Sequence, residues 1–368
     1  MASYLQHIVT ANPSTRYAQS LIRDKMKEHL ADDRRTSAIL HRIYQESGIE
    51  YRHSVVQDYS ESPSEFLLFH PEDGVLHPST GTRNAIYQRE AGRMFVDLAN
   101  QVVADSGVDR SDITHVITVS CTGFFAPGPD FEIVEALGLE GSTQRFHLGF
   151  MGCYAAFPAL RMAHSFCEGN PNARVLIVSV ELCTLHFQAT KELDHLIGAA
   201  IFADGGAGLL VSGRPLANAP ALESQTYANT ITKTGKKDMA WTIGDQGFDM
   251  ILSSYVPDII EANLDEALSP LLDQAGLAIS EIDMWGLHPG GRAIVDKVES
   301  SLELRLEQLE ASRHVLANYG NMSSATVLFV LQRILASKTT SDGDSVLGLA
   351  FGPGLSIESG VFRKRSIS

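Results

Sequence analysis

An internal repeat constrains the fold of this chain more than any other feature of the sequence. Residues 98–108 and 268–277 each carry the end of a helical pattern, and each pattern stops at a glycine, Gly107 or Gly276. The glycines are 276 − 107 = 169 residues apart. Self-similarity at a fixed offset is typical of one structural unit used twice. The alternative is a chance similarity between two ordinary α/β stretches.

Each copy contains a helical pattern, a short link, a buried strand and a loop. In the first copy, apolar residues recur at helical spacing between Tyr87 and Val102, and Gly107 is suited to end that helix. Short apolar runs predict strands buried on both faces, at residues 115–119, 174–180, 284–287 and 346–351. We therefore expect an α/β protein of two similar halves, residues 1–213 and 214–368, related by a pseudo-twofold axis.

Composition excludes several classes of function. A net charge of −15 argues against nucleic-acid binding, which needs a basic face. No apolar stretch reaches the roughly 18 residues that cross a bilayer, and the N-terminus shows no signal-peptide pattern. The four cysteines have neither the paired spacing of a metal site nor a disulfide framework. We expect free thiols, no metal, no membrane span and a cytoplasmic location.

Three residues of catalytic type, Cys153, His288 and Asn321, lie in short glycine-punctuated loops beside apolar runs. The repeat places Asn321 opposite Gly152, since 321 − 152 = 169, so the two halves should bring the three side chains together. A thiol can attack a thioester, an imidazole can take its proton, and a carboxamide can stabilise developing negative charge. Each residue also has a structural explanation: Cys153 could be a small buried side chain, His288 a turn residue, and Asn321 a turn residue or a helix cap.

The segment around Cys153 is typical of a strand-to-helix turn. Gly152 precedes the cysteine and small residues follow it, so the thiol should lie at a helix N-terminus, where the pKa of a thiol is expected to fall. Pro158 would break a helix that began at Cys153. The helix is therefore expected to be kinked or to start later.

Two other glycine-rich segments have weaker signals. Phe351-Gly352-Pro353-Gly354 follows a predicted buried strand, and it is either an ordinary tight turn or a rigid loop that shapes a cavity wall. Residues 203–208 are also rich in glycine, but they lack the lysine and the spacing of a phosphate-binding loop. A nucleotide site is not expected there.

Taken together, these motifs resemble the type III polyketide synthases, the chalcone-synthase-like branch of the thiolase superfamily. The resemblance runs almost from end to end and rests on motifs in the right order: Thr10-Ala11-Asn12-Pro13, Ser120-Cys121-Thr122-Gly123, Gly152-Cys153, Val180-Glu181-Leu182-Cys183, Phe202-Ala203-Asp204-Gly205, His288-Pro289-Gly290-Gly291, Tyr319-Gly320-Asn321-Met322-Ser323-Ser324 and Phe351-Gly352-Pro353-Gly354. It implies a thiolase-like five-layer αβαβα fold and a homodimer. It also implies acyl-CoA and malonyl-CoA as substrates, with no other cofactor.

The resemblance implies a role for each site residue. Cys153 matches the nucleophile that holds the starter acyl group and the growing chain as a thioester. His288 pairs with the thiol and, together with Asn321, binds the thioester carbonyl of malonyl-CoA during decarboxylation. Phe202 and Phe248 match two gate residues between the CoA tunnel and the cavity.

Other residues are expected to line the substrate cavity or its gate: Cys121, Cys183, His186, Ser323, Phe351, Gly352, Pro353 and Gly354. Three of them, Cys121, Cys183 and His186, stand where plant chalcone synthases carry hydroxyl side chains, and Ala350 replaces a usual glycine. The run around Cys183 resembles microbial members that use fatty acyl starters and release alkylpyrones or alkylresorcinols.

Three rival interpretations stay open. A ketoacyl synthase III-type enzyme of fatty-acid synthesis has the same fold and residues and stops after one condensation. A papain-like cysteine hydrolase has the same residue order, but its cysteine lies near the mature N-terminus. A non-catalytic binding or scaffold protein would not need the three residues to meet.

Overall fold

The computed structural model describes residues 2–367, and within them nine strands form one central sheet. In sheet order the strands are β13 (Met284–Leu287), β14 (Ser345–Gly352), β15 (Ser356–Arg365), β10 (Ala221–Ile231), β1 (Tyr4–Ala11), β9 (Asp204–Ser212), β8 (Arg174–Leu182), β6 (His115–Ser120) and β7 (Gln144–Gly149). β1 and β10 pair antiparallel at the centre, so each half of the chain supplies one side of the sheet. Because the halves share a sheet, their exact boundary at residue 213 stays a prediction.

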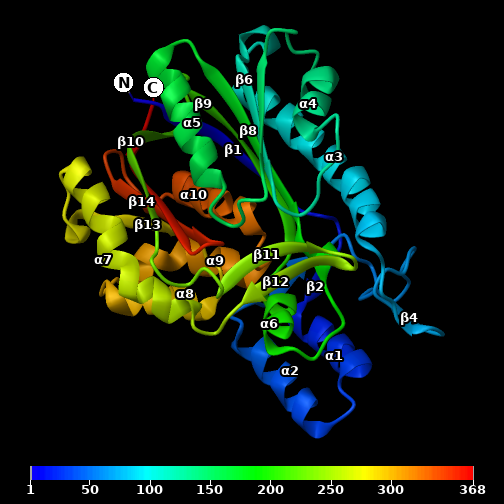
Figure 1. Ribbon diagram of the computed structural model, residues 1–368. Helices are drawn as coiled ribbons and strands as arrows, with labels where there is room; N and C mark the ends of the chain where they lie inside the picture. Colours follow the sequence, from blue (N-terminus) through cyan, green and yellow to red (C-terminus); the bar gives the residue numbers. More distant parts are fainter. Residues whose placement is uncertain (1, 368) are drawn as a thin grey trace.

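Helices cover and separate the two sides of this sheet (Figure 1). The helices are α1 (Gln19–Leu30), α2 (Arg34–Glu46), α3 (Thr80–Ser106), α4 (Pro129–Leu137), α5 (Ala156–Gly169), α6 (Leu193–Ile201), α7 (Val256–Ala275), α8 (Arg292–Ser301), α9 (Glu310–Tyr319) and α10 (Thr326–Ala336). α5 and α10 lie in the middle, because α5 contacts β8, β9 and β15 while α10 contacts β13, β14 and β1. α3 packs outside the first side and α7 outside the second. The layers therefore alternate as αβαβα, which confirms the predicted fold.

The repeat seen in the sequence is a repeat of structure. α3 and α7 end 275 − 106 = 169 residues apart, and β6 and β13 begin 284 − 115 = 169 residues apart. The glycines that follow the two helices have nearly the same left-handed conformation, with φ of 64° at Gly107 and 66° at Gly276. Glycine is favoured there because it has no Cβ to oppose a positive φ.

The core lies in the two interfaces around the strands and in the central helix layer. All eight residues of β14 are buried, as are eight of the nine in β8. Apolar strands of this kind are stable only with helices on both faces. The side chains of α5 and α10 fill the space between the two sides of the sheet, where Phe157, Leu328 and Leu331 are fully buried.

Shorter elements complete the fold. The short strands are β2 (Arg16–Ala18), β3 (Tyr51–His53), β4 (Phe69–His70), β5 (Gly74–Val75), β11 (Met239–Gly244) and β12 (Gly247–Leu252), and the single-turn helices are η1 (Arg110–Asp112), η2 (Cys183–His186), η3 (Ile279–Glu281), η4 (Leu306–Leu309) and η5 (Ser323–Ala325). β11 and β12 form a hairpin that crosses in front of the junction between the two halves (Figure 1). The sequence patterns did not predict this hairpin.

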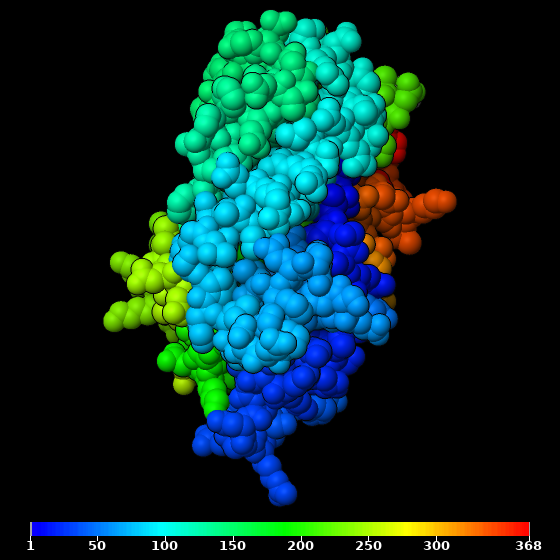
Figure 2. All heavy atoms as spheres, turned by 90° about the vertical axis from the view of Figure 1, so that its right-hand side faces the viewer, coloured from blue at the N-terminus to red at the C-terminus, as the bar shows by residue number. Residues whose placement is uncertain are grey.

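Figure 2 shows the molecule from the side of α3, where most of the visible surface, blue to green, belongs to the first half of the chain. The second half emerges at the two margins of this view. Within residues 2–367, none of the helices combines the length and the apolar character needed to cross a membrane.

Candidate active site

Cys153 lies in a turn between β7 and α5 whose backbone only a glycine allows. Gly152 has a φ of 83°, and a Cβ at that position would lie 2.4 Å from Cδ of Pro353. A side chain at residue 152 would therefore be strained and would also collide with the loop after β14. The turn from the first half thus packs tightly against the second half, and Cys153 is fixed at that contact.

The helix after Cys153 starts later than the cysteine, which was one of the two outcomes expected from Pro158. α5 begins at Ala156, after a turn in which the amide of Ala155 donates to the carbonyl of Gly152. Pro158 is then in the first helical turn, where its missing N–H removes no intrahelical hydrogen bond. Cys153 accordingly precedes the helix instead of forming part of it.

His288 and Asn321 reach the same place from the second half. His288 directly follows β13, and its amide donates to the carbonyl of Leu349 at 2.7 Å. Asn321 lies between α9 and η5, and its backbone is held by the first half: its amide donates to the carbonyl of Ile201, and its carbonyl accepts from the amide of Ala203. Both residues are buried, with 1% exposure each.

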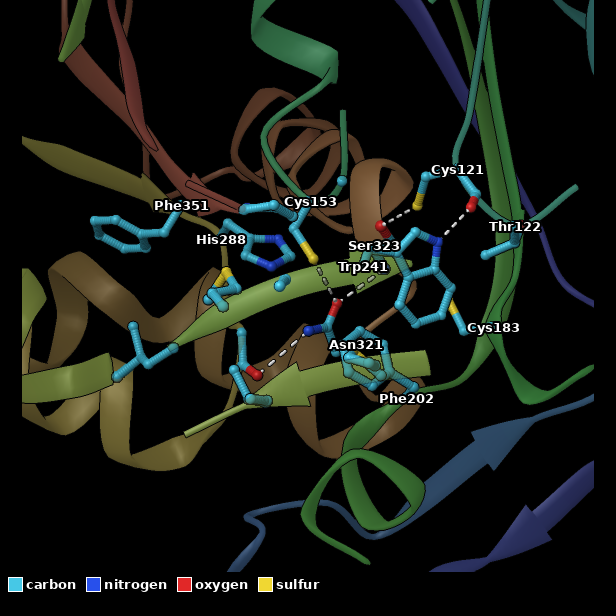
Figure 3. Close-up of a pocket in the computed structure, with 18 residues that line it drawn as sticks. Cys121, Thr122, Cys153, Cys183, Phe202, Trp241, His288, Asn321, Ser323 and Phe351 are labelled. Atoms are coloured by element: carbon cyan, nitrogen blue, oxygen red, sulfur yellow. Dashed lines mark hydrogen bonds between the residues drawn. The ribbon is translucent and has the colours of Figure 1, made fainter. Parts of the chain in front are cut away.

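The three side chains meet in the wall of one cavity. Sγ of Cys153 lies 4.0 Å from Oδ1 of Asn321, and Figure 3 shows the His288 ring beside the sulfur. This is the meeting that the repeat predicted. The three residues therefore satisfy the geometric condition for acting together on one substrate.

The carboxamide of Asn321 is held in one orientation. Its Oδ1 accepts from the amide of Ser323 at 2.8 Å, so the NH₂ group must face the other way. Nδ2 donates to the carbonyl of Gly290 at 3.3 Å. An NH₂ group has two protons, so a second one is available to a ligand.

His288 is free to bind a ligand. Among the described residues, neither ring nitrogen has a hydrogen-bond partner, although the side chain is buried. Buried polar atoms in folded proteins nearly always have a partner, and exceptions mark functional sites. An imidazole with both nitrogens unpaired at a cavity wall is suited to hold a substrate oxygen and to exchange a proton with a thiol.

Burial keeps Cys153 and His288 uncharged. It raises the pKa of the Cys153 thiol to about 11, although hydrogen bonds with Ser323 and Asn321 act in the opposite direction. Burial also lowers the pKa of His288 to about 3. The expected acidification of the thiol by a helix N-terminus is therefore wrong in sign, because desolvation outweighs it.

Most of the predicted pocket residues line this cavity: Cys121, Cys183, Phe202, Ser323, Phe351 and Pro353. Gly352 and Gly354 shape the loop that forms one wall. A Cβ on Gly352 would lie 2.4 Å from Cδ1 of Tyr154, and Gly354 has a φ of 119°. Gly352 therefore allows a close approach that a side chain would prevent, and Gly354 adopts a positive φ that favours glycine.

Two of the residues predicted for the cavity or its gate line a neighbouring cavity. Phe248 and His186 line a second cavity and not the cavity of Cys153. The two cavities adjoin, because Cys183, Phe202, Trp241 and Met250 line both. Phe202 lines both cavities, as a gate residue would. Phe248 lines only the second cavity and does not contact the cavity that contains the sulfur.

The residues that the β11–β12 hairpin supplies to the cavity were not predicted from the sequence. Met239, Ala240 and Trp241 come from β11, and Met250 and Leu252 come from β12. The sequence signal that could have revealed the hairpin is the glycine in Asp245-Gln246-Gly247, because glycine is common in hairpin turns. In the structure Gly247 has a φ of 115°. Its flanks do not alternate clearly between polar and apolar residues, so the strands left little trace in the sequence.

The sequence patterns also predicted no role for Glu181. Its carboxylate is fully buried and accepts from the Thr122 hydroxyl at 2.8 Å, from the Cys121 amide at 2.9 Å and from the Ser324 hydroxyl. The first two donors belong to the first half and the third to the second half. Glu181 therefore ties the segment that carries Asn321 to the loop that carries Cys121.

Comparison with known proteins identifies the family of this site. The family model for chalcone and stilbene synthases, N-terminal domain, matches residues 4–215, and the model for the C-terminal domain matches residues 223–367. The chain belongs to the chalcone and stilbene synthase family. It is thus a type III polyketide synthase by family.

Solved structures of this family share the fold of the chain. PKS-I of the brown alga Ectocarpus siliculosus has a TM-score of 0.91 at 28% identity and covers 99% of this chain and 98% of its own. The C-terminal type III domain of the Dictyostelium hybrid 'Steely1' has a TM-score of 0.91 at 28% identity, with full coverage of both chains. 1,3,6,8-Tetrahydroxynaphthalene synthase from Streptomyces coelicolor A3(2) has a TM-score of 0.88 at 26% identity and covers 98% of this chain and 99% of its own.

A curated relative, probable polyketide synthase 1 of Dictyostelium discoideum, is 32% identical over 375 residues. The match covers 99% of this chain and 12% of that much longer protein. The resemblance to type III polyketide synthases is confirmed, and a microbial branch is compatible with these relatives. The family match favours this interpretation over a ketoacyl synthase III, and a papain-like hydrolase does not fit it.

Proposed function

We propose that this chain loads an acyl group from acyl-CoA onto Cys153 and extends it with malonyl-CoA in repeated decarboxylative condensations. One observation carries the proposal: Cys153, His288 and Asn321, contributed by two halves of the chain, face one apolar cavity. The family uses acyl-CoA and malonyl-CoA substrates, which agrees with this chemistry.

Loading needs a proton transfer inside the site. The thiol of Cys153 passes its proton to His288, and the resulting thiolate and imidazolium stabilise each other as neighbouring opposite charges. The thiolate attacks the acyl carbonyl, the bond between that carbonyl and the CoA sulfur breaks, and CoA leaves with the proton from His288. Neutral resting groups favour entry of an apolar acyl chain.

Extension uses His288 and Asn321 as donors. The free N–H of Asn321 and a ring N–H of His288 would both point at the thioester oxygen of malonyl-CoA. Loss of CO₂ leaves an enolate on that oxygen, and two donors aimed at it lower the barrier. The enolate carbon then attacks the thioester on Cys153, which releases the thiolate and lengthens the chain by two carbons.

The cavity walls support an apolar starter, and we extend the proposal to a fatty acyl group. Met239, Met250, Leu252, Ile294 and Phe351 all present apolar side chains to the space around the sulfur. Such walls favour an alkyl chain over a polar one. Ring closure to a pyrone or resorcinol would follow extension, since a poly-β-keto thioester can react with itself.

The experiment that tests the function is a panel of acyl-CoAs of rising chain length, each given with malonyl-CoA. Products are read by mass spectrometry, and the acyl group on Cys153 is read by intact mass and peptide mapping. We expect products with two or more extensions and cyclic masses. A single β-keto product from every starter would instead assign the chain to the ketoacyl synthase III type.

We also propose that the chain works as a homodimer. β7 lies at the edge of the nine-stranded sheet, and four of its six residues are exposed. Three phenylalanines nearby are unusually open, with exposures of 49% for Phe124, 38% for Phe131 and 36% for Phe150. An open sheet edge flanked by apolar rings is unfavourable in water, and a second copy of the chain would cover it.

The proposed chemistry sets two further conditions. It needs no cofactor beyond the CoA thioesters, because loss of CO₂ supplies the carbanion and the thiol supplies the leaving group. It does need a reduced thiol at Cys153, and all four cysteines of the chain are free. A reducing compartment such as the cytoplasm is therefore the proposed location.

A further inference from the structure

Three rings from different segments form a cluster in the wall of the second cavity: His186 from η2, Trp241 from β11 and Phe248 from β12. The imidazole of His186 stacks on Phe248, with ring centroids 4.0 Å apart and planes 9° apart. Trp241 stands edge-on to both, 5.6 Å from His186 and 5.7 Å from Phe248. Trp241 also lines the cavity of Cys153, so the ring cluster is part of the partition between the two cavities.

His186 holds this cluster through both of its ring nitrogens. Nε2 lies 2.6 Å from the carbonyl oxygen of Thr122, and because a carbonyl only accepts, Nε2 carries the proton. Nδ1 lies 3.1 Å from the amide nitrogen of Phe248, and because that amide only donates, Nδ1 must be unprotonated. The two contacts together require the neutral Nε2–H tautomer. Burial lowers the pKa of His186 to about 3, which agrees with that requirement.

The hairpin is thereby attached to two consecutive carbonyls of the first half. Thr122 holds Phe248 through His186, and Cys121 holds Trp241 directly, since the indole Nε1 donates to its carbonyl at 2.7 Å. Figure 3 shows the Trp241 indole with its nitrogen directed at the Cys121 carbonyl. The position of this aromatic wall therefore depends on the turn that carries His186.

Arg83 holds the η2 turn in place through hydrogen bonds to its backbone. Its guanidinium is buried, with 2% exposure, and Nη1 donates to the carbonyls of Leu185 and Phe187, the residues on either side of His186. Nε donates to the carbonyl of Pro78 at 3.0 Å. These three acceptors are neutral backbone groups. A buried arginine whose N–H groups donate to backbone carbonyls is unusual, since buried charges are ordinarily paired with opposite charges.

Arg83 also limits the hairpin turn. A Cβ on Gly247 would lie 3.0 Å from Nε of Arg83, and the positive φ of Gly247 disfavours any side chain there. The amide of Gly247 donates to the hydroxyl of Thr80, one turn before Arg83 on α3. The start of α3 thus supports both η2 and the hairpin.

We propose that Arg83 and His186 are positioning residues for chain extension: they hold Trp241 and Phe248 as a rigid partition that limits how far the growing chain can extend. The inference rests on the proposed function, since it concerns the extension steps that follow loading of Cys153. Neither side chain lines the cavity of Cys153. Their effect on the reaction passes through the ring cluster.

The test compares His186→Gln with His186→Leu in the full chain. Glutamine offers one donor and one acceptor and can replace both hydrogen bonds, whereas leucine fills the space and replaces neither. The proteins are given acetyl-, octanoyl- and lauroyl-CoA with malonyl-CoA. We expect His186→Leu to change the ratio of products with successive numbers of extensions by about tenfold, as expected for loss of one or two buried hydrogen bonds. His186→Gln should keep the ratio of the wild type.

Acylation of Cys153, measured by intact mass in a single turnover, should change by less than about twofold in both variants if the partition acts after loading. Arg83→Met should shift the product ratio in the same direction as His186→Leu. Arg363→Met is the matched control, because Arg363 also donates to a backbone carbonyl, that of Gly343, and lies outside both cavities. It should leave the ratio unchanged.

An unchanged product ratio in His186→Leu, or a ratio in His186→Gln as altered as in His186→Leu, would overturn the proposal. If His186→Leu does not unfold cooperatively, Arg83→Lys takes its place: it keeps the charge but cannot reach all three carbonyls, and an unchanged ratio there counts against the proposal. Failure of the function itself would look different, because the wild-type chain would then take no acyl group on Cys153 from any starter.

Discussion

At the scale of single residues, burial acts on Cys153 and His288 in the same sense by disfavouring the charged form of each. The pKa of the thiol rises to about 11 and that of the imidazole falls to about 3, so the resting pair is neutral. A proton transfer between them creates two charges at once, and each charge offsets the desolvation of the other. The site can therefore exclude water and still produce a thiolate when substrate is present.

Removing the sulfur should separate the two chemical steps. Cys153→Ala should abolish acyl loading and chain extension, because the other two thiols of the cavity, Cys121 and Cys183, are buried and burial raises the pKa of each well above its usual value. Cys153→Gln should keep decarboxylation of malonyl-CoA, since His288 and Asn321 remain in place to bind the carbonyl. Acetyl-CoA formed from malonyl-CoA, followed by chromatography and mass spectrometry, measures the second activity. Equal loss of both activities in Cys153→Gln would count against the division of labour.

The depressed pKa of His288 predicts sensitivity to acid. The folded state resists protonation of this histidine down to pH about 3, whereas the unfolded chain takes up the proton near pH 6.5. The unfolded state therefore binds more protons between those values, and stability falls as the pH is lowered through that window. From pH 7 to pH 5, this one group should reduce the free energy of unfolding by about 2 kcal/mol.

Urea denaturation of the wild type and of His288→Gln at both pH values checks this sign. The variant cannot be protonated at that position, so its loss of stability between pH 7 and pH 5 should be smaller by about the same 2 kcal/mol. A variant that loses as much stability as the wild type would show that His288 is accessible to protons in the folded state.

At the scale of elements, the turn before α5 decides where the nucleophile sits. Its tight packing on the loop after β14 leaves no space at Gly152, whose Cβ would meet Pro353 at 2.4 Å. The hairpin β11–β12 closes the opposite side of the cavity with Trp241 and Met250. Catalytic geometry in this chain therefore depends on a contact between loops of different halves and not on any single helix or strand.

Gly152→Ala should lower stability and the rate of Cys153 acylation more than the same substitution at a glycine without close neighbours. Gly138 offers the control, since its φ of 60° is also left-handed but no atom lies within 4 Å of its Cβ position. Gly138→Ala should lose about 1 kcal/mol of stability from backbone strain alone. Gly152→Ala should lose a few kcal/mol, because strain and collision add, and should also slow acylation of Cys153. Thermal unfolding and single-turnover acylation measure the two effects, and similar behaviour of the two variants would contradict the proposed contact.

At the scale of the whole molecule, the two halves share one sheet and one cavity. β1 and β10 join them by backbone hydrogen bonds, and Glu181 joins them again by accepting from Thr122 and Ser324. The free edge of the sheet at β7 lies at the far end from this junction. The surface there is the part of the molecule that a second copy would cover.

Charging that surface should weaken the proposed dimer. Phe131 on α4 lies against β7, with the Arg145 guanidinium 5.5 Å from its ring. Arg145 already pairs with Asp130 at 2.6 Å, so Phe131→Glu would add a second carboxylate beside that pair and remove an apolar ring. Burying this extra charge in the contact is costly, so the chain should become monomeric at micromolar concentration. Leu306→Glu is the control, because Leu306 is 64% exposed but belongs to η4 in the second half. Light scattering measures the mass, and a dimeric Phe131→Glu variant would place the interface elsewhere.

Much of the fold could be predicted because it follows from local patterns. Buried strands, helix ends at Gly107 and Gly276, and the 169-residue offset between them are readable in the chain, and the structure confirms each of them. The hairpin could not be predicted, because its residues are selected by contact with the cavity and not by alternation. Phe248 was expected as a gate residue and His186 as a residue of the cavity or its gate, but their place in the second cavity depends on how η2 and β12 pack together.

By itself, the sequence determined the α/β class, the duplicated halves and the identity of the three residues that meet, because periodicity and repeat offset are properties of the chain. Only the tertiary structure decided which side chains share a cavity with Cys153. It also decided that the thiol and the imidazole are neutral at rest, contrary to the expected lowering of the thiol pKa. Both outcomes depend on desolvation and on contacts between distant segments, and these arise only when the two halves pack against each other.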